Sequence, residues 1–419
     1  MRKEQENKEQ SSRWYTLASV FTLGGISLFI GCLAIISPQV AMEASLRGVS
    51  VWWEVLFPAL FPFFVLSELL LGFGIVHLAG TLLDPFMRPL FRLPGVGGFV
   101  VAMGFASGYP VGARLTSRLM EQKLVTRNQG ERLVAMTTTS DPIFLIGAVC
   151  IGFFGSLEAA PALAVAHYGG ALLLGVFSHF RKQGHSSFLE TVHPIKGSRI
   201  GAALSAMHRA RLADGRPFGI LLQQSLQSSL TLMMIVGGLV VFFSAALELL
   251  VHSGFLMFFR DLTARLLHEF GLYPGLASSF VKGTFEVTLG AKSSAADTAI
   301  PLVDRAAAAA FVLSWGGLSV HAQVAGLMSR TDWRYIPFAR ARFIHGLLAM
   351  LLVYLVWPLF MQKETMSLPV WAQAIPPFHR TLIPTVAWLP LVVLTVIAVI
   401  VAAGALALGI AKMRRGREV

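Results

Sequence analysis

The chain has 419 residues, of which 55% are hydrophobic and only 13% are charged. A soluble domain carries about 25% charged residues, so this composition and the mean hydropathy of +0.67 exclude an ordinary soluble enzyme. The formal net charge of +12 would suggest nucleic acid as the partner of a soluble protein. In a membrane protein it is typical of Lys and Arg in short cytoplasmic loops, so we predict no nucleic-acid partner.

Long apolar stretches predict that the chain crosses a bilayer several times. Each is about 20 residues long, which is enough to span a hydrocarbon core about 30 Å thick. We therefore predict an all-α polytopic membrane protein, with about eight transmembrane helices plus two re-entrant hairpins in an inverted repeat. The predicted spans cover residues 16–36, 52–76, 133–154, 161–180, 226–251, 306–328, 343–360 and 384–410.

Two further apolar segments, residues 95–112 and 270–290, are too short and too rich in glycine for ordinary spans. Pro110 interrupts the first, and the second half of the other is polar. We interpret both as re-entrant hairpins. Clusters of Lys and Arg place the polar loop 181–216 and the C-terminus on the cytoplasmic side.

The two hairpins occupy corresponding places in residues 52–154 and 226–328. Their closest local match aligns Gly112-Ala113-Arg114 with Gly290-Ala291-Lys292, at an offset of 178 residues. The count of crossings gives the two units opposite orientations, and inverted repeats with interrupted helices are typical of secondary transporters. The predicted organisation is an N-terminal head with the first helix (1–51), a first gate-like repeat with one further span (52–180), a basic cytoplasmic loop (181–225), a second gate-like repeat (226–328) and C-terminal helices (329–419).

Four motifs, in this order, resemble the sporulation integral membrane proteins of the nucleoside-recognition (gate) domain family. They are Gly104-Phe-Ala-Ser-Gly-Tyr-Pro-Val-Gly-Ala-Arg114, Thr138-Thr-Ser-Asp-Pro142, Glu286-Val-Thr-Leu-Gly290 and Gly316-Gly-Leu-Ser-Val-His-Ala-Gln323. The resemblance implies a multi-pass protein of the outer forespore membrane, facing the mother cell, that moves dipicolinate during endospore formation. The gate module also occurs in nucleoside carriers and ferrous-iron transporters. A carrier of nucleosides or other small metabolites, and a non-transporting sporulation membrane assembly protein, therefore stay open.

Dipicolinate is a flat pyridine ring with two carboxylates, so a site for it needs positive charge or oriented N–H donors at two places. Arg114 and Lys292 are matched cations at the ends of the two hairpins, and each could hold one carboxylate. The alternative is that both side chains reach from the hairpins to the membrane interface.

Ser107, Gly108 and Tyr109 precede Pro110 at a predicted helix break. Free backbone N–H groups at such a break could bind an anion, and the tyrosine ring could stack on the substrate. A tight turn with an interfacial tyrosine is the structural alternative.

Further candidates are polar residues inside apolar segments. Glu286 and Thr288 lie in the second hairpin, where the carboxylate could hold a coupling proton or cation, or pair with Lys292. Asp141 is either a helix cap before Pro142 or, with Ser140, a lining residue of the site.

His321 and Gln323 lie deep in the predicted span 306–328. The histidine either contacts substrate or a proton, or forms a hydrogen bond between helices. No nucleotide-binding loop or metal-ligand spacing accompanies these residues, so we predict no enzyme activity, no cofactor and no metal site. The expected partners are a small-molecule anion and the lipid bilayer, and a homo-oligomer or a complex with sporulation membrane proteins stays open.

Overall fold

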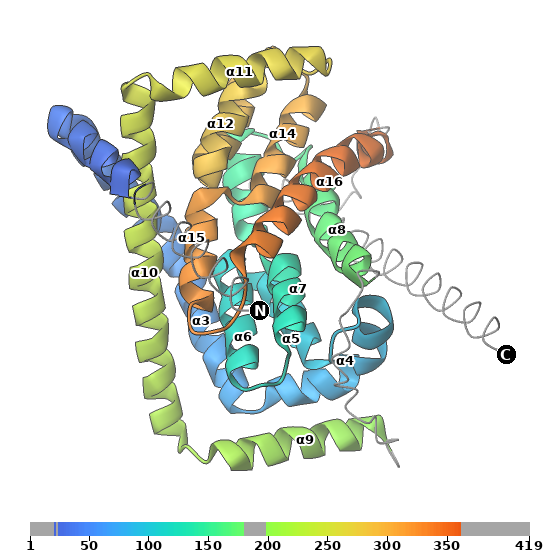
Figure 1. The fold of residues 1–419 in the computed structure, drawn as a ribbon. Coiled ribbons are helices and arrows are strands. Elements are labelled where there is room, and N and C mark those ends of the chain that lie inside the picture. The colour runs from blue at the N-terminus through green and yellow to red at the C-terminus, as the bar shows by residue number, and fades with distance from the viewer. Residues whose placement is uncertain (1–20, 22–23, 180–197, 362–419) are drawn as a thin grey trace, which may run out of the picture.

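The computed structural model describes residue 21, residues 24–179 and residues 198–361, and the statements below refer to these residues. They form helices and no β-strand, which confirms the all-α prediction (Figure 1). The predicted span 384–410 lies outside the described residues, as do residues 1–20, 22 and 23.

Residues 38–179 contain the helices of the first repeat, the helix before it and the helix after it. In chain order these are α2 (Pro38–Val51), the π-helical η1 (Trp52–Leu56), α3 (Phe57–Gly72), α4 (Ile75–Phe91), α5 (Val96–Ser107), α6 (Tyr109–Glu121), α7 (Arg127–Thr137), the π-helical η2 (Ile143–Phe153) and α8 (Ala160–His179).

The second half of the described chain repeats this series. It contains α9 (Arg199–Asp214), α10 (Phe218–His252), α11 (Phe255–Glu269), the short 3-10 helix η3 (Pro274–Leu276), α12 (Ala277–Phe285), α13 (Val287–Ala296), α14 (Leu302–Trp315), α15 (Gly317–Met328) and α16 (Tyr335–Met361). Within the predicted polar connection 181–216, residues Arg199–Asp214 form α9, which is not among the candidate membrane spans.

By length and composition, four of the described helices can cross a membrane, or up to six if each bent pair is one span. These helices confirm the polytopic membrane class. The number is below the eight expected from the sequence, partly because of the undescribed residues. The predicted continuous span 133–154 is also wrong, since the chain leaves the helix between Thr137 and Ile143. Pro142 has no N–H to donate there and disfavours a helical residue before it.

Two long helical runs form the scaffold. Residues 38–72 are one helical run through α2, η1 and α3, which begins 14 residues before the predicted span 52–76, and this run packs along α10. The indole N–H of Trp52 donates to the carbonyl of Met233 at 3.0 Å. A Cβ at Gly237 would lie 2.5 Å from the Trp52 ring, so only glycine allows this approach.

The two repeats lie at opposite ends of the molecule. After α3 the chain turns into α4 near the lower end of α10, whereas after α10 it turns into α11 across the upper end (Figure 1). Each turn is followed by a helical hairpin, α5–α6 in the lower half and α12–α13 in the upper half, and then by a broken helix, α7–η2 or α14–α15. The element order therefore repeats with the arrangement that the sequence predicts.

A buried carboxylate ties the first repeat to the start of α16. Glu131 in α7 is 5% exposed and accepts hydrogen bonds from the Arg334 guanidinium at 2.8 and 2.9 Å. Burial alone would raise the pKa of Glu131, but the hydrogen bonds and charge of Arg334, helped by Arg127, outweigh it and hold this pKa below its usual value. Because the carboxylate is more acidic in the folded state, its stabilising contribution is present above the unfolded pKa and is lost as pH falls through the folded value.

We therefore expect Glu131→Gln to remove part of the acid sensitivity of the protein. The melting temperature in detergent should fall less for Glu131→Gln than for the wild type between neutral pH and about pH 3. Glu158→Gln is the control, because Glu158 is exposed and forms no ion pair in the described part of the chain. Equal acid dependence in the wild type and in Glu131→Gln would contradict this role for the pair.

Candidate functional site

A cavity of about 60 Å³ lies where the hairpins, the broken helices and the scaffold meet. Scaffold side chains such as Leu60 and Val236 form its apolar wall. Its polar lining consists of Tyr109, Asp141, Glu286, Thr288, Ser319 and Gln323. The fold thus brings five of the residues singled out in the sequence to one place. No Lys or Arg is among the residues that line the cavity.

The first hairpin breaks at Gly108, which has a φ of 85° in the left-handed region that favours glycine. A Cβ at this position would lie 3.0 Å from Oδ2 of Asp141, so glycine allows the hairpin to lie against the break of α7–η2. Ser107 is buried just before it, and its hydroxyl has no hydrogen-bond partner in the described structure. The ring of Tyr109 lines the cavity while its hydroxyl donates to the carbonyl of Leu313 in α14 at 2.8 Å. The first hairpin therefore contacts the second repeat directly.

The break between α7 and η2 is held by hydrogen bonds on both sides. The backbone N–H of Ser140 donates to Nε2 of His167 at 2.9 Å, and the Tyr168 hydroxyl donates to the Ser140 carbonyl at 3.0 Å. Asp141 caps η2, because its Oδ1 accepts from the N–H of Phe144 at 2.8 Å. Asp141 thus has the capping contact expected from the sequence, and it lines the cavity as well.

The second hairpin breaks at Glu286, an extended residue that is 7% exposed. Its carboxylate accepts from the N–H of Leu289 at 2.7 Å and so caps α13. A Cβ at Gly317, where φ is 73°, would lie 3.0 Å from the backbone nitrogen of Glu286. The second hairpin break therefore lies against the second helix break, as in the first repeat. Thr288 follows on the cavity wall.

His321 and Gln323 follow the break at Gly316, where the predicted span 306–328 is divided into α14 and α15. Nε2 of His321 lies 3.1 Å from the Trp315 carbonyl and Nδ1 lies 2.9 Å from the Tyr335 hydroxyl. These partners fit a neutral imidazole that donates through Nε2 and accepts at Nδ1. His321 satisfies the end of α14 and does not line the cavity, whereas Gln323 does.

Four helix N-termini meet at this cavity. They belong to α6, η2, α13 and α15, and residues from the beginning of each line the wall. The N-terminus of a helix carries a partial positive charge and free N–H groups. Asp141 and Glu286 occupy two of these ends, while α6 and α15, which follow Gly108 and Gly316, have no side-chain cap. Each repeat therefore supplies one capped and one uncapped helix end.

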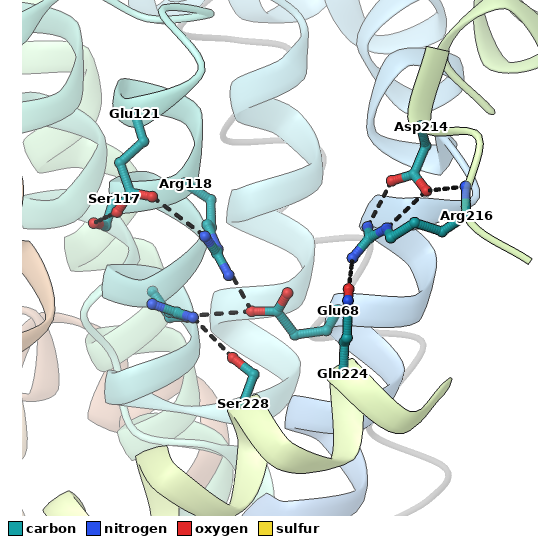
Figure 2. A network of polar contacts seen from close by, with 9 residues as sticks. Glu68, Ser117, Arg118, Glu121, Asp214, Arg216, Gln224 and Ser228 are labelled. Carbon is teal, nitrogen blue, oxygen red and sulfur yellow. Dashed lines mark hydrogen bonds and ion pairs between the residues drawn. The ribbon is translucent and has the colours of Figure 1, made fainter. Parts of the chain in front are cut away.

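Arg114 lies outside the cavity, in a polar network around Glu68 of α3. Its Nε is 3.2 Å from Oε1 of Glu68, and its Nη2 donates to the Ser228 hydroxyl of α10 at 2.9 Å. Arg118 approaches the same carboxylate at 3.7 Å and pairs with Glu121 at 3.3 Å (Figure 2). These contacts anchor the second helix of the first hairpin to both scaffold helices.

Lys292, the matched cation of the second hairpin, is exposed and forms no ion pair in the described part of the chain. Neither Arg114 nor Lys292 lines the cavity, and Glu286 caps a helix instead of pairing with Lys292. What Arg114 and Lys292 share is a closely packed glycine two residues earlier. A Cβ at Gly112 would lie 2.4 Å from the carbonyl oxygen of Thr137 in α7, and a Cβ at Gly290 would lie 2.3 Å from Cα of Gly283 in the other helix of its hairpin.

Sequence reasoning missed a group of buried polar residues on α8 and α16. Arg342 and His345 are both 0% exposed, as is His167, and the three are joined by hydrogen bonds that reach both helix breaks. The signal was present, because ionisable residues inside apolar segments mark functional positions by default. Among the described residues, no group of three or more His, Cys, Asp or Glu could hold a metal ion.

The paired hairpins and broken helices, together with the long apolar helices, define an all-α integral membrane protein that crosses the bilayer several times. Residues 53–160 match the Gate family, described as "Nucleoside recognition". The chain is 43% identical over 334 residues to "Sporulation integral membrane protein YlbJ" of Bacillus subtilis (strain 168), which covers 80% of this chain and 82% of that protein. The chain belongs to the family of this sporulation membrane protein.

A shorter match joins the chain to an uncharacterized protein of Alkalihalophilus pseudofirmus, with 34% identity over 112 residues, or 26% of this chain and 24% of that protein. No solved structure matches the chain.

Proposed function

We propose that this protein carries dipicolinate across the outer forespore membrane during endospore formation, with the cavity as its binding site. The observation that carries the proposal is the meeting of both hairpins and both broken helices, one set from each repeat, at one cavity. Substrate sites of transporters with inverted repeats lie at such interrupted helices, near the middle of the membrane. The sporulation role of the family and the resemblance to its motifs support dipicolinate as the substrate.

The chemistry of the cavity fits a flat aromatic dianion. The Tyr109 ring and the scaffold side chains offer apolar surface to a pyridine ring. The uncapped N-termini of α6 and α15 offer one partial positive charge for each carboxylate. The helix α6 belongs to the first repeat and α15 to the second, so the two carboxylates of one substrate would be held at two separate points.

The negative charges of Asp141 and Glu286 must be offset when a dianion binds. Two carboxylates on the wall would repel a doubly negative substrate if all were ionised. We therefore propose that at least one of them takes up a proton or a cation when the substrate binds. Arg114 then serves to hold the first hairpin against the scaffold through Glu68, and does not contact the substrate.

A carrier of nucleosides is the second candidate, supported by the description of the matched Gate family. Gln323, Thr288 and Ser319 could form hydrogen bonds with a neutral ribose or base.

Binding measurements on the purified protein test the choice. We expect dipicolinate to bind and adenosine and uridine to bind at least about tenfold more weakly, because a neutral ligand makes no charge-assisted hydrogen bonds with the uncapped helix ends. Spores of a strain that lacks the gene should also contain little dipicolinate. Preferential binding of nucleosides would replace the proposal with the second candidate. Normal dipicolinate content in those spores, with no binding of either ligand, would favour an assembly role.

A further inference from the structure

Arg342 in α16 is a buried cation without an anionic partner. Its side chain is 0% exposed, and no carboxylate of the described residues forms an ion pair with it. Its Nη2 donates to the carbonyl of Ser314, and its Nη1 lies 3.3 Å from the carbonyl of Ala135 and 2.9 Å from Nδ1 of His345. An arginine in such a place stays protonated near neutral pH, so the positive charge is present under physiological conditions.

The two carbonyls belong to corresponding points of the two repeats. Ala135 lies near the end of α7 and Ser314 near the end of α14, the two half-helices that stop at the breaks. The C-terminal end of a helix carries a partial negative charge of about half an electron, so one guanidinium offsets two such ends. The side chain of Arg342 thus links the end of α7 in the first repeat to the end of α14 in the second.

Two histidines extend the contact to the breaks themselves. His345 accepts from Arg342 at Nδ1, so its Nε2 donates to the carbonyl of His167 at 2.8 Å. His167 accepts from the N–H of Ser140 at Nε2, so its Nδ1 donates to the Ser314 hydroxyl at 2.8 Å. These hydrogen bonds assign both histidines as neutral. Arg342 is then the sole charged member of the network.

The network lies directly behind the cavity. Tyr109, which lines the cavity, donates to the carbonyl of Leu313, and the next carbonyl along the chain accepts from Arg342. Asp141 and Glu286 line the same cavity as Tyr109. Without Arg342, the charged groups around this tyrosine would all be negative, with two negative helix ends behind them.

We propose that Arg342 is the residue that makes the cavity selective for anions: its charge neutralises the ends of α7 and α14 behind the cavity, and its forked hydrogen bonds fix their separation. This inference rests on the proposed function in taking a carboxylate as the substrate. Arg342 acts through the two helix ends and does not touch the ligand, so it is a positioning residue whose effect must grow with ligand charge.

The test compares three pyridines of different charge on the purified full-length protein: dipicolinate with two negative charges, picolinate with one, and neutral pyridine-2,6-dicarboxamide. Arg342→Gln removes the charge. We expect its affinity to fall by about tenfold or more for dipicolinate, by less for picolinate and by less than about threefold for the diamide. Arg342→Lys keeps the charge and loses the fork, so its affinities should fall by the same factor for all three ligands.

An equal loss for all three ligands in a folded Arg342→Gln protein would overturn the inference and leave Arg342 a purely structural role. His345→Gln is the matched control, because it alters a neighbour of Arg342 without changing charge and should affect the ligands equally. If Arg342→Gln does not fold, a loss that depends on ligand charge in Arg342→Lys would still overturn the inference. Failure of the wild type to bind dipicolinate would instead contradict the proposed function.

Discussion

Spores that rely on a Glu286→Gln protein are expected to contain at least about tenfold less dipicolinate than those with the wild-type protein. Glu286 lines the cavity, caps α13 through the N–H of Leu289 and has no cation beside it on the cavity wall. Glutamine keeps an oxygen that can cap the helix, so the hairpin should still form. It can no longer take up a proton or hold a cation, and the step that couples the substrate to a change in charge is lost.

Glu248→Gln is the matched control for this experiment. Glu248 lies in the scaffold helix α10, half exposed, and pairs with Arg47 at 3.2 Å outside the cavity. An exposed pair of this kind contributes about 1 kcal/mol or less, so the control should accumulate dipicolinate normally. The amount of each protein in the membrane should be measured in parallel. Normal dipicolinate content with Glu286→Gln at wild-type protein levels would leave Glu286 as a helix cap and no more.

Gly290→Ala is expected to destabilise the protein by about 1–3 kcal/mol or to prevent its assembly. A Cβ at Gly290 would lie 2.3 Å from Cα of Gly283 and 2.8 Å from Cγ1 of Val312. The first of these contacts is backbone, which cannot rotate away, so α12 and α13 would have to separate. Gly112 occupies the matching place in the first hairpin, where a Cβ would lie 2.4 Å from the carbonyl oxygen of Thr137, and Gly112→Ala should have a similar effect.

The control for the glycine experiment is Gly326→Ala in α15. A Cβ at Gly326 meets nothing within 4 Å, and alanine favours a helix over glycine by about 1 kcal/mol, so this variant should be at least as stable as the wild type. Thermal unfolding in detergent, followed by size-exclusion chromatography, measures all three variants. If Gly290→Ala unfolds at the same temperature as Gly326→Ala, the two hairpin helices do not approach each other as closely as described.

The match between the two hairpins located corresponding positions correctly, but it did not show which residue of each triplet matters. The alignment of Gly112-Ala113-Arg114 with Gly290-Ala291-Lys292 located corresponding points of the two hairpins, which the structure bears out in its element order. The charged residue of each triplet suggested a pair of cations that bind the substrate. The close contacts lie at the glycines, while Arg114 pairs with Glu68 and Lys292 is exposed. Charge is visible in a sequence, whereas the partner of that charge is not.

The breaks were predictable to different degrees. Pro110 predicted the break in the first hairpin, because proline lacks an N–H and restricts the residue before it. Pro142 carries the same signal, but the span 133–154 was predicted as continuous. The break at Gly316 was missed, because two glycines in an apolar span are equally compatible with close packing of a continuous helix. Only the neighbouring chain at Glu286, which approaches Gly317 closely, requires the left-handed conformation there.

The amino-acid sequence by itself determined that this is an all-α membrane protein with two hairpin units, because apolar length, glycine content and proline position act locally along the chain. It also singled out Tyr109, Asp141, Glu286, Thr288 and Gln323, which the fold brings to one cavity. Only the tertiary structure decided that four helix N-termini converge there, and that Arg342 offsets two helix C-termini behind them. The field of a helix end depends on where the helix points and on what lies opposite, and residues about 180 positions apart in the chain determine both.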